Sequence, residues 1–141
     1  MPRLAILLAA LALGHAGPAA ASALDGTWAV TMVCPPHQAA SDDALGYTHR
    51  FKGQVAGRQF SATYGTENQP GWHHLRGRIA DDGSATLRLD GIVDNARHAI
   101  NGAQRGKPYT YRVKAQFDAR AGTGQRLTGR RCDFQFDRQD P

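Results

Sequence analysis

Apolar residues recur at every second position in one run after another of this chain, and short polar turns separate the runs. In the clearest run, Tyr109, Tyr111, Val113, Ala115 and Phe117 alternate with polar side chains. Successive side chains of a β-strand point to opposite faces, so this alternation predicts strands with one buried face. The same pattern predicts strands over residues 28–34, 47–55, 60–64, 73–79, 85–93, 109–117 and 125–138.

The connections between these predicted strands are mostly short. Sequences at 56–58, 68–71, 81–83 and 121–124 are rich in glycine, asparagine and aspartate and are typical of hairpin turns. Two longer stretches cover 35–45 and 94–108, and an eighth strand around residues 97–100 is an alternative within the second. Seven or eight antiparallel strands in sequence predict an all-β, up-and-down barrel, because closure removes the exposed edges.

The two cysteines indicate how such a barrel closes. Cys34 ends the first predicted strand, Cys132 lies in the last, and both fall on the apolar face of their strand. We predict a disulfide between them, which requires the first and last strands to be neighbours. Antiparallel pairing with the cysteines opposed would bring Trp28 opposite Arg138, with the guanidinium over the indole ring.

The first 23 residues predict a cleaved secretory signal peptide. Arg3 precedes an apolar run over residues 4–14, and residues 21–23 form an A-x-A cleavage site. The run is shorter than the roughly 20 residues of a membrane span, so we expect no membrane anchor. Residues 24–141 then form one domain, located in the periplasm or secreted, where a disulfide is stable.

The formal charge of the full chain is +5, and the basic residues are spread along the sequence. This favours a solvated, arginine-rich surface, and attraction to phosphate-rich envelope polymers is the alternative. Export argues against a nucleic-acid partner.

A short motif near the start resembles a known superfamily. Gly26-Thr27-Trp28 resembles the G-x-W sequence that opens calycins such as lipocalins, and avidins begin similarly. The resemblance implies a barrel in which a late arginine packs across the tryptophan. Arg138 is the first candidate for that arginine, with Arg130 and Arg131 as alternatives. The chain also resembles small exported proteins of bacteria.

A binding site is expected at one end of the barrel. Aromatic and polar residues cluster near predicted strand ends and loops, which suits recognition of a small molecule or glycan. The residues in question are Tyr64, Trp72, His73, His74 and Tyr109. The alternative is that the tyrosines simply fill the core.

Catalytic and metal chemistry are not indicated by any motif. The sequence contains no G-x-S-x-G elbow and no visible Ser-His-Asp arrangement. His73 and His74 are adjacent, so on a strand they would point to opposite faces and chelate poorly. We expect no metal and no cofactor. The sequence leaves an enzymatic role open as a third hypothesis behind binding and interaction.

Two functional hypotheses rank ahead of an enzymatic role. The first is a monomeric exported binding module for a small apolar or glycan-like ligand. The second is an inhibitor or interaction protein that acts on a protein partner through loops 35–45 or 94–108.

Overall fold

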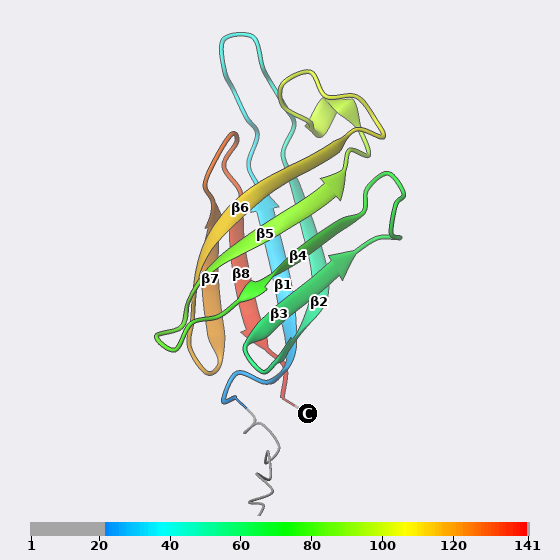
Figure 1. Cartoon of the computed structure of the whole chain (residues 1–141). Coiled ribbons are helices and arrows are strands. Elements are labelled where there is room, and N and C mark those ends of the chain that lie inside the picture. The colour runs from blue at the N-terminus through cyan, green and yellow to red at the C-terminus, as the bar shows by residue number, and fades with distance from the viewer. Residues whose placement is uncertain (1–21, 141) are drawn as a thin grey trace, which may run out of the picture.

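The computed structural model describes residues 22–140, which form a closed barrel of eight antiparallel strands (Figure 1). Each strand pairs with its neighbours in sequence, and the first strand also pairs with the last. The elements are β1 (Gly26–Cys34), β2 (Tyr47–Ala56), β3 (Gln59–Tyr64), β4 (His73–Arg78), β5 (Ser84–Ile92), the 3₁₀ helix η1 (Ala96–His98), β6 (Pro108–Phe117), β7 (Ala121–Arg126) and β8 (Asp133–Arg138). The prediction of an antiparallel up-and-down barrel is confirmed.

The period-2 alternation separates the interior of the barrel from its outer wall. In β6, Tyr111, Val113, Ala115 and Phe117 are buried, whereas the side chains between them are exposed. The other strands show the same alternation, because each lies with one face on a shared core and the other toward water. The faces predicted from the sequence are the faces that the barrel buries.

The eighth strand lies where a turn was expected. Residues 121–124 form most of β7 rather than a turn, and the predicted strand 125–138 is divided between β7 and β8. The actual turn comes earlier, where the Asp118 carboxylate accepts hydrogen bonds from the backbone N–H groups of Arg120 and Ala121, both at 2.8 Å. Gly122 and Gly124 point inward and leave room for aromatic rings, so glycine here serves packing and not a turn.

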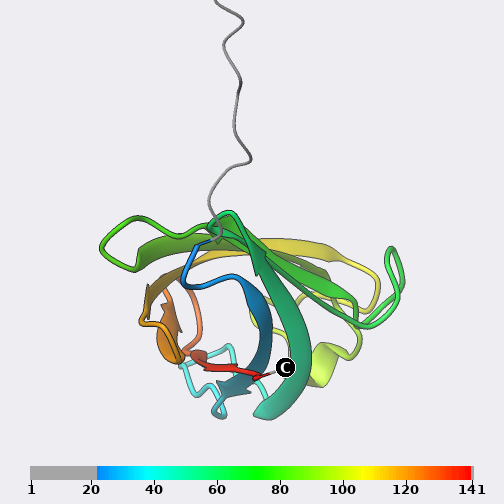
Figure 2. The same ribbon diagram turned by 90° about the horizontal axis from the view of Figure 1, so that it is seen from below.

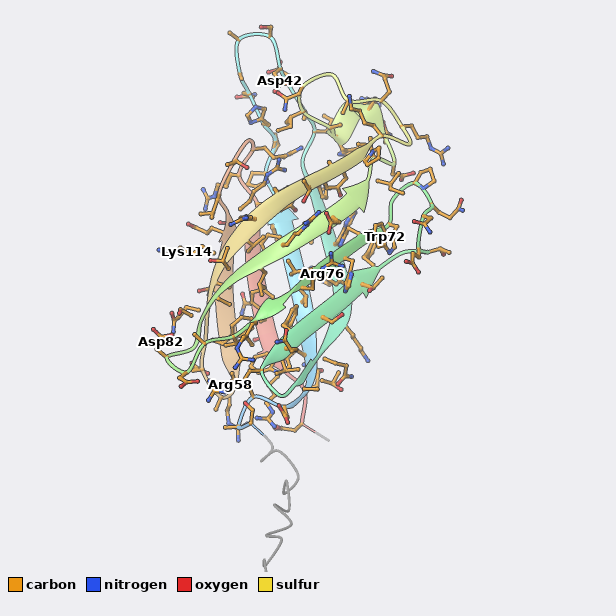
Figure 3. All side chains as sticks on the ribbon, in the orientation of Figure 1. Asp42, Arg58, Trp72, Arg76, Asp82 and Lys114 are labelled. Atoms are coloured by element: carbon orange, nitrogen blue, oxygen red, sulfur yellow. A yellow bond between two sulfur atoms is a disulfide. The ribbon has the colours of Figure 1, made fainter. Side chains whose placement is uncertain are left out.

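The long connection between β5 and β6 holds no strand at 97–100. It contains η1, whose first N–H groups are partly satisfied by the Asn95 side chain, which accepts from the Arg97 N–H at 2.9 Å. Asparagine favours such caps and turns over strand pairing, which explains why the strand alternative is wrong. The connection between β1 and β2 lies at the same end of the barrel, and the Asn101 N–H donates to the Asp42 carboxylate at 2.6 Å (Figures 1 and 3).

The Cys34–Cys132 disulfide joins the segments that close the barrel. The two residues are 98 positions apart, and both are buried. Cys34 ends β1, and Cys132 directly precedes β8, which pairs with β1. A disulfide of this kind is compatible with an extracytoplasmic protein.

In the part of the chain that the structure describes, no helix is long and apolar enough to cross a membrane. The predicted signal peptide lies, up to residue 21, outside the described residues.

The register of β1 and β8 pairs Trp28 with Arg138. The guanidinium is used differently from the sequence expectation, because it donates hydrogen bonds to backbone carbonyls. Its acceptors are Asp25 at 2.7 Å, Ala119 at 3.3 Å and Ala23. The Trp28 indole N–H donates to the Leu24 carbonyl at 2.9 Å, and the ring packs edge-on against Phe117. Arg138 therefore fastens the first described residues across this end of the barrel.

Aromatic side chains fill the barrel at the end where the described chain starts and finishes, which faces the viewer in Figure 2. Trp28, Phe60, Phe117 and Phe136 are at most 4% exposed. Their ring centroids lie 4.7–5.8 Å apart in tilted or edge-to-face pairs, a favourable geometry for aromatic packing. This half of the interior is solid, so any internal space lies toward the opposite end.

Candidate functional site

A cavity of about 510 Å³ opens at the end of the barrel opposite the aromatic core. We call it the mouth cavity. It is lined by Tyr47, His49, Tyr64, Gly71, Ile92, Val93, Asp94, Asn95, His98, Ala99, Ile100, Asn101, Ala103, Lys107, Pro108, Tyr109, Thr110, Arg126 and Arg130. Its volume falls within the range that small-molecule sites occupy.

Strand parity places the deepest of these side chains. Tyr47 and His49 begin the inward face of β2, Tyr64 ends that of β3, and Tyr109 begins that of β6. Arg126 ends the inward face of β7, after Gly122 and Gly124. Since alternate strands run in opposite directions, the starts of β2 and β6 meet the ends of β3 and β7 at one rim. The loop that carries η1 forms the remaining wall.

Two histidines and a tyrosine form a stacked cluster at the base of one wall. His49 Nδ1 lies 3.1 Å from His73 Nε2, so one imidazole donates to the other. The Tyr64 ring lies nearly parallel to both, with centroids 4.2 Å from His49 and 5.0 Å from His73. Phe51 packs against His73 from another side, at 4.9 Å between centroids. The cluster is therefore packed like core, although it carries polar atoms.

Both histidines of this cluster are held neutral. Burial, with a smaller contribution from the neighbouring His49, lowers the pKa of His73 from 6.5 to about 3. Burial also lowers the pKa of His49, and Asp94 opposes that effect. His73 Nδ1 is buried without a partner among the described residues. A proton on Nε2 of His73 leaves no buried N–H unsatisfied, which favours donation from His73 to His49.

The tyrosines of the mouth cavity are packed in part against glycine. The rings of Tyr109 and Tyr111 are stacked with centroids 6.1 Å apart. Tyr109 lies over Gly91, where a Cβ atom would come within 2.5 Å of the ring. Burial raises the pKa of Tyr47, Tyr109 and Tyr111, so all three are neutral at physiological pH. Their rings offer flat apolar walls with hydroxyl groups attached.

Arg130 ties the loops around the mouth cavity together. It is 2% exposed, and its guanidinium donates to the backbone carbonyls of His98 at 2.7 Å, Pro35 at 2.5 Å and Leu45 at 3.1 Å. Its guanidinium carbon lies 5.2 Å from the Tyr47 ring centroid. These bonds join the β1–β2, β5–β6 and β7–β8 connections. Arg130 is therefore chiefly a positioning residue, which keeps the rim of the cavity in place.

Arg126 makes fewer hydrogen bonds within the protein than Arg130 does. Its guanidinium carbon lies 4.0 Å above the Tyr111 ring centroid, a cation–π geometry. Its Nε donates to the Thr128 carbonyl. The side chain is half-buried in the wall of the cavity.

Of the site residues predicted from the sequence, the structure places some at the mouth cavity and others away from it. Tyr64 and Tyr109 line the mouth cavity, and His73 lies directly behind Tyr64 in the core. Trp72 and His74 lie outside the lining, with ring centroids 6.5 Å apart, and Figure 3 marks Trp72 beside the start of β4. The outer position of His74 is fixed by a 2.8 Å hydrogen bond between its Nε2 and the Ser61 hydroxyl.

Sequence reasoning missed most of the lining residues, among them Tyr47, His49, Arg126 and Arg130. Tyr47 and His49 share the apolar-leaning face of their strand with Phe51, so parity could have found them. Arg126 has the same parity as Cys132 and Phe134, so alternation within the predicted strand 125–138 could have placed it on the inward face. Arg130 was weighed as an alternative partner of Trp28, whereas it contacts Tyr47 at the other end. Nothing local in the sequence indicates that contact.

Two larger hollows, of about 800 and 600 Å³, lie on the outer wall. They are lined mainly by outward side chains of the strands, and no aromatic cluster converges on either. In the second, the register places Arg88 opposite both Arg76 and Arg112. Asp90 pairs with Arg76 and Arg88. Basic residues that are spread along the sequence are thus adjacent on this wall, where Figure 3 labels Arg76.

Within residues 22–140, no three histidine, cysteine, aspartate or glutamate side chains converge in an arrangement that could hold a metal ion. The mouth cavity is the place where aromatic rings and polar donors meet.

No protein-family model, curated protein or solved structure matches this chain.

Proposed function

We propose that the protein is a binding module, periplasmic or secreted, that holds a small ligand with an apolar face in the mouth cavity. The observation that supports this is the convergence of Tyr47, Tyr64 and Tyr109 around a space of about 510 Å³. Rings on several walls can cover a flat or aliphatic ligand while their hydroxyl groups stay near water. The solid aromatic core below gives the cavity a rigid base.

Rigidity of the rim supports the same proposal. Arg130, in the β7–β8 connection, donates hydrogen bonds to carbonyls of the β1–β2 and β5–β6 connections. Asp42 also joins the β1–β2 loop to the β5–β6 loop. A rim ordered in advance loses little conformational entropy when a ligand binds, which improves affinity. The interior of an eight-stranded barrel is wide enough for one small ligand at most.

Native mass spectrometry of protein purified from the cells that export it tests this proposal. We expect a retained small molecule on the wild type. Tyr64→Ala removes one wall and should lose that mass, whereas Thr63→Ala changes the exposed neighbour on the same strand and should keep it. A ligand retained equally by both variants, or no ligand on the wild type, contradicts the proposal.

A second candidate is an interaction with a protein partner. The β1–β2 connection projects beyond the strand ends (Figure 1), and an isolated bridge between His37 and Ala44 gives it the shape of a short hairpin. A co-purifying protein that is lost when residues 38–43 are replaced by a short turn, with no small molecule on the wild type, would support this candidate over the first.

A further inference from the structure

We infer that the ligand of the mouth cavity is a small organic anion, with a carboxylate-type head bound by Arg126 and an apolar body against the tyrosines. This inference rests on the proposed function and names the chemical class of its ligand. It follows from the balance of charge and of donors in the cavity.

Arg126 carries a charge that the protein does not neutralise. Its Nε is used by the Thr128 carbonyl, and its ring contact is with Tyr111. Within residues 22–140, its two Nη atoms have no hydrogen-bond acceptor, and no carboxylate lies within 4.0 Å of it. A half-buried charge is costly unless it is paired. A bound anion would supply the pair.

The neighbouring charges make the cavity more positive. Arg130 is almost fully buried and uses its Nη atoms on three neutral carbonyls, so its charge is also uncompensated by a carboxylate. Among the lining residues only Asp94 has a carboxylate. That side chain is 67% exposed and lies 3.7 Å from Arg105, and no ion pair joins it to Arg126 among the described residues.

The tyrosines cannot serve as the missing anions. Burial raises the pKa of Tyr47 and Tyr109, so their hydroxyl groups stay protonated. Burial lowers the pKa of Arg126, but a guanidinium stays charged at neutral pH. The cavity therefore offers a cation and neutral hydroxyl groups between apolar rings. The planar guanidinium suits the two oxygens of a carboxylate, which it can bind with two parallel hydrogen bonds.

Isothermal titration with matched acids and amides tests the inference. The probes are decanoate with decanamide, and naphthoate with naphthamide, because each pair differs in charge and little in shape. The wild type should bind at least one acid roughly tenfold to a hundredfold more tightly than its amide. Arg126→Gln should remove that preference and leave the amide affinity unchanged. Arg112→Gln, on the exposed face of β6, is the matched control and should keep the preference.

The outcomes separate this inference from the function on which it rests. If the wild type binds acid and amide equally, the inference that the ligand is an anion is wrong, whereas the small-ligand site remains. The inference also fails if Arg126→Gln keeps the preference, or if Arg112→Gln loses it, because the attraction would then be general. Binding of none of the four probes overturns the small-ligand site itself. Urea unfolding of each variant shows whether a lost affinity reflects a lost fold.

Discussion

Burial of His73 makes the stability of this barrel depend on pH between about 6.5 and about 3. The side chain is 1% exposed, between Phe51, Tyr64 and His49, and its pKa falls from 6.5 to about 3 in the folded protein. As the pH falls, His73 is protonated near pH 6.5 in the unfolded chain but only near pH 3 in the folded barrel. The unfolded state therefore binds more protons in this window, and the free energy of unfolding falls as pH falls.

The size of the effect follows from those two pKa values. Between about pH 7.5 and about pH 5, a single site of this kind loses about 2 kcal/mol of stability. With a typical urea dependence, that is a shift of roughly 1 M in the unfolding midpoint. His49, whose pKa burial also lowers, adds a loss of the same sign.

Urea unfolding at the two pH values, followed by the fluorescence of buried Trp28, measures this loss. His73→Phe keeps a ring between Phe51 and Tyr64 but cannot titrate, so its loss should be smaller by about 2 kcal/mol. His74→Gln removes the outward histidine next in sequence and should retain most of the wild-type dependence. If wild type and His73→Phe lose equal stability, the reasoning from burial is refuted.

Three further substitutions test other parts of the structure. Cys132→Ser opens a bridge between residues 98 positions apart, and chain entropy predicts a loss of up to roughly 4–5 kcal/mol; a thermal midpoint that does not change in reductant would contradict this. Arg130→Met leaves three backbone carbonyls without their donor and should cost roughly 2–4 kcal/mol, with faster hydrogen exchange in the mouth loops; unchanged exchange there would show that Arg130 does not hold them. Gly91→Ala places a Cβ within 2.5 Å of the Tyr109 ring and should cost roughly 1–3 kcal/mol in urea unfolding while weakening any mouth ligand; full stability and affinity together would mean that the ring has room to move.

Much of the barrel was predictable because its signal is local. Strand geometry alternates side chains between two faces, so a residue and its second neighbour in β6 share a face whatever lies around them. The cysteine pair extended this local signal to closure, since Cys34 and Cys132 can be bonded only if the end strands are close.

The turn at 121–124 was mispredicted for a physical reason. Glycine suits both a tight turn and a strand position that faces a large ring, and sequence alone does not distinguish the two. The rings that decide the matter belong to Phe117 and Phe136, which approach Gly122 and Gly124 from neighbouring strands.

The sequence by itself therefore determined the fold class, the order of most strands, the inward faces and the bond that closes the barrel. Only the tertiary structure decided which inward residues meet at the open end. It brought Arg126 to Tyr111 and Arg130 to Tyr47, and it placed His73 against His49 and Phe51 in the core. Side-chain alternation is set by the covalent geometry of each strand. Which side chains meet, and how deeply they are buried, depends on register and packing between residues far apart in the chain.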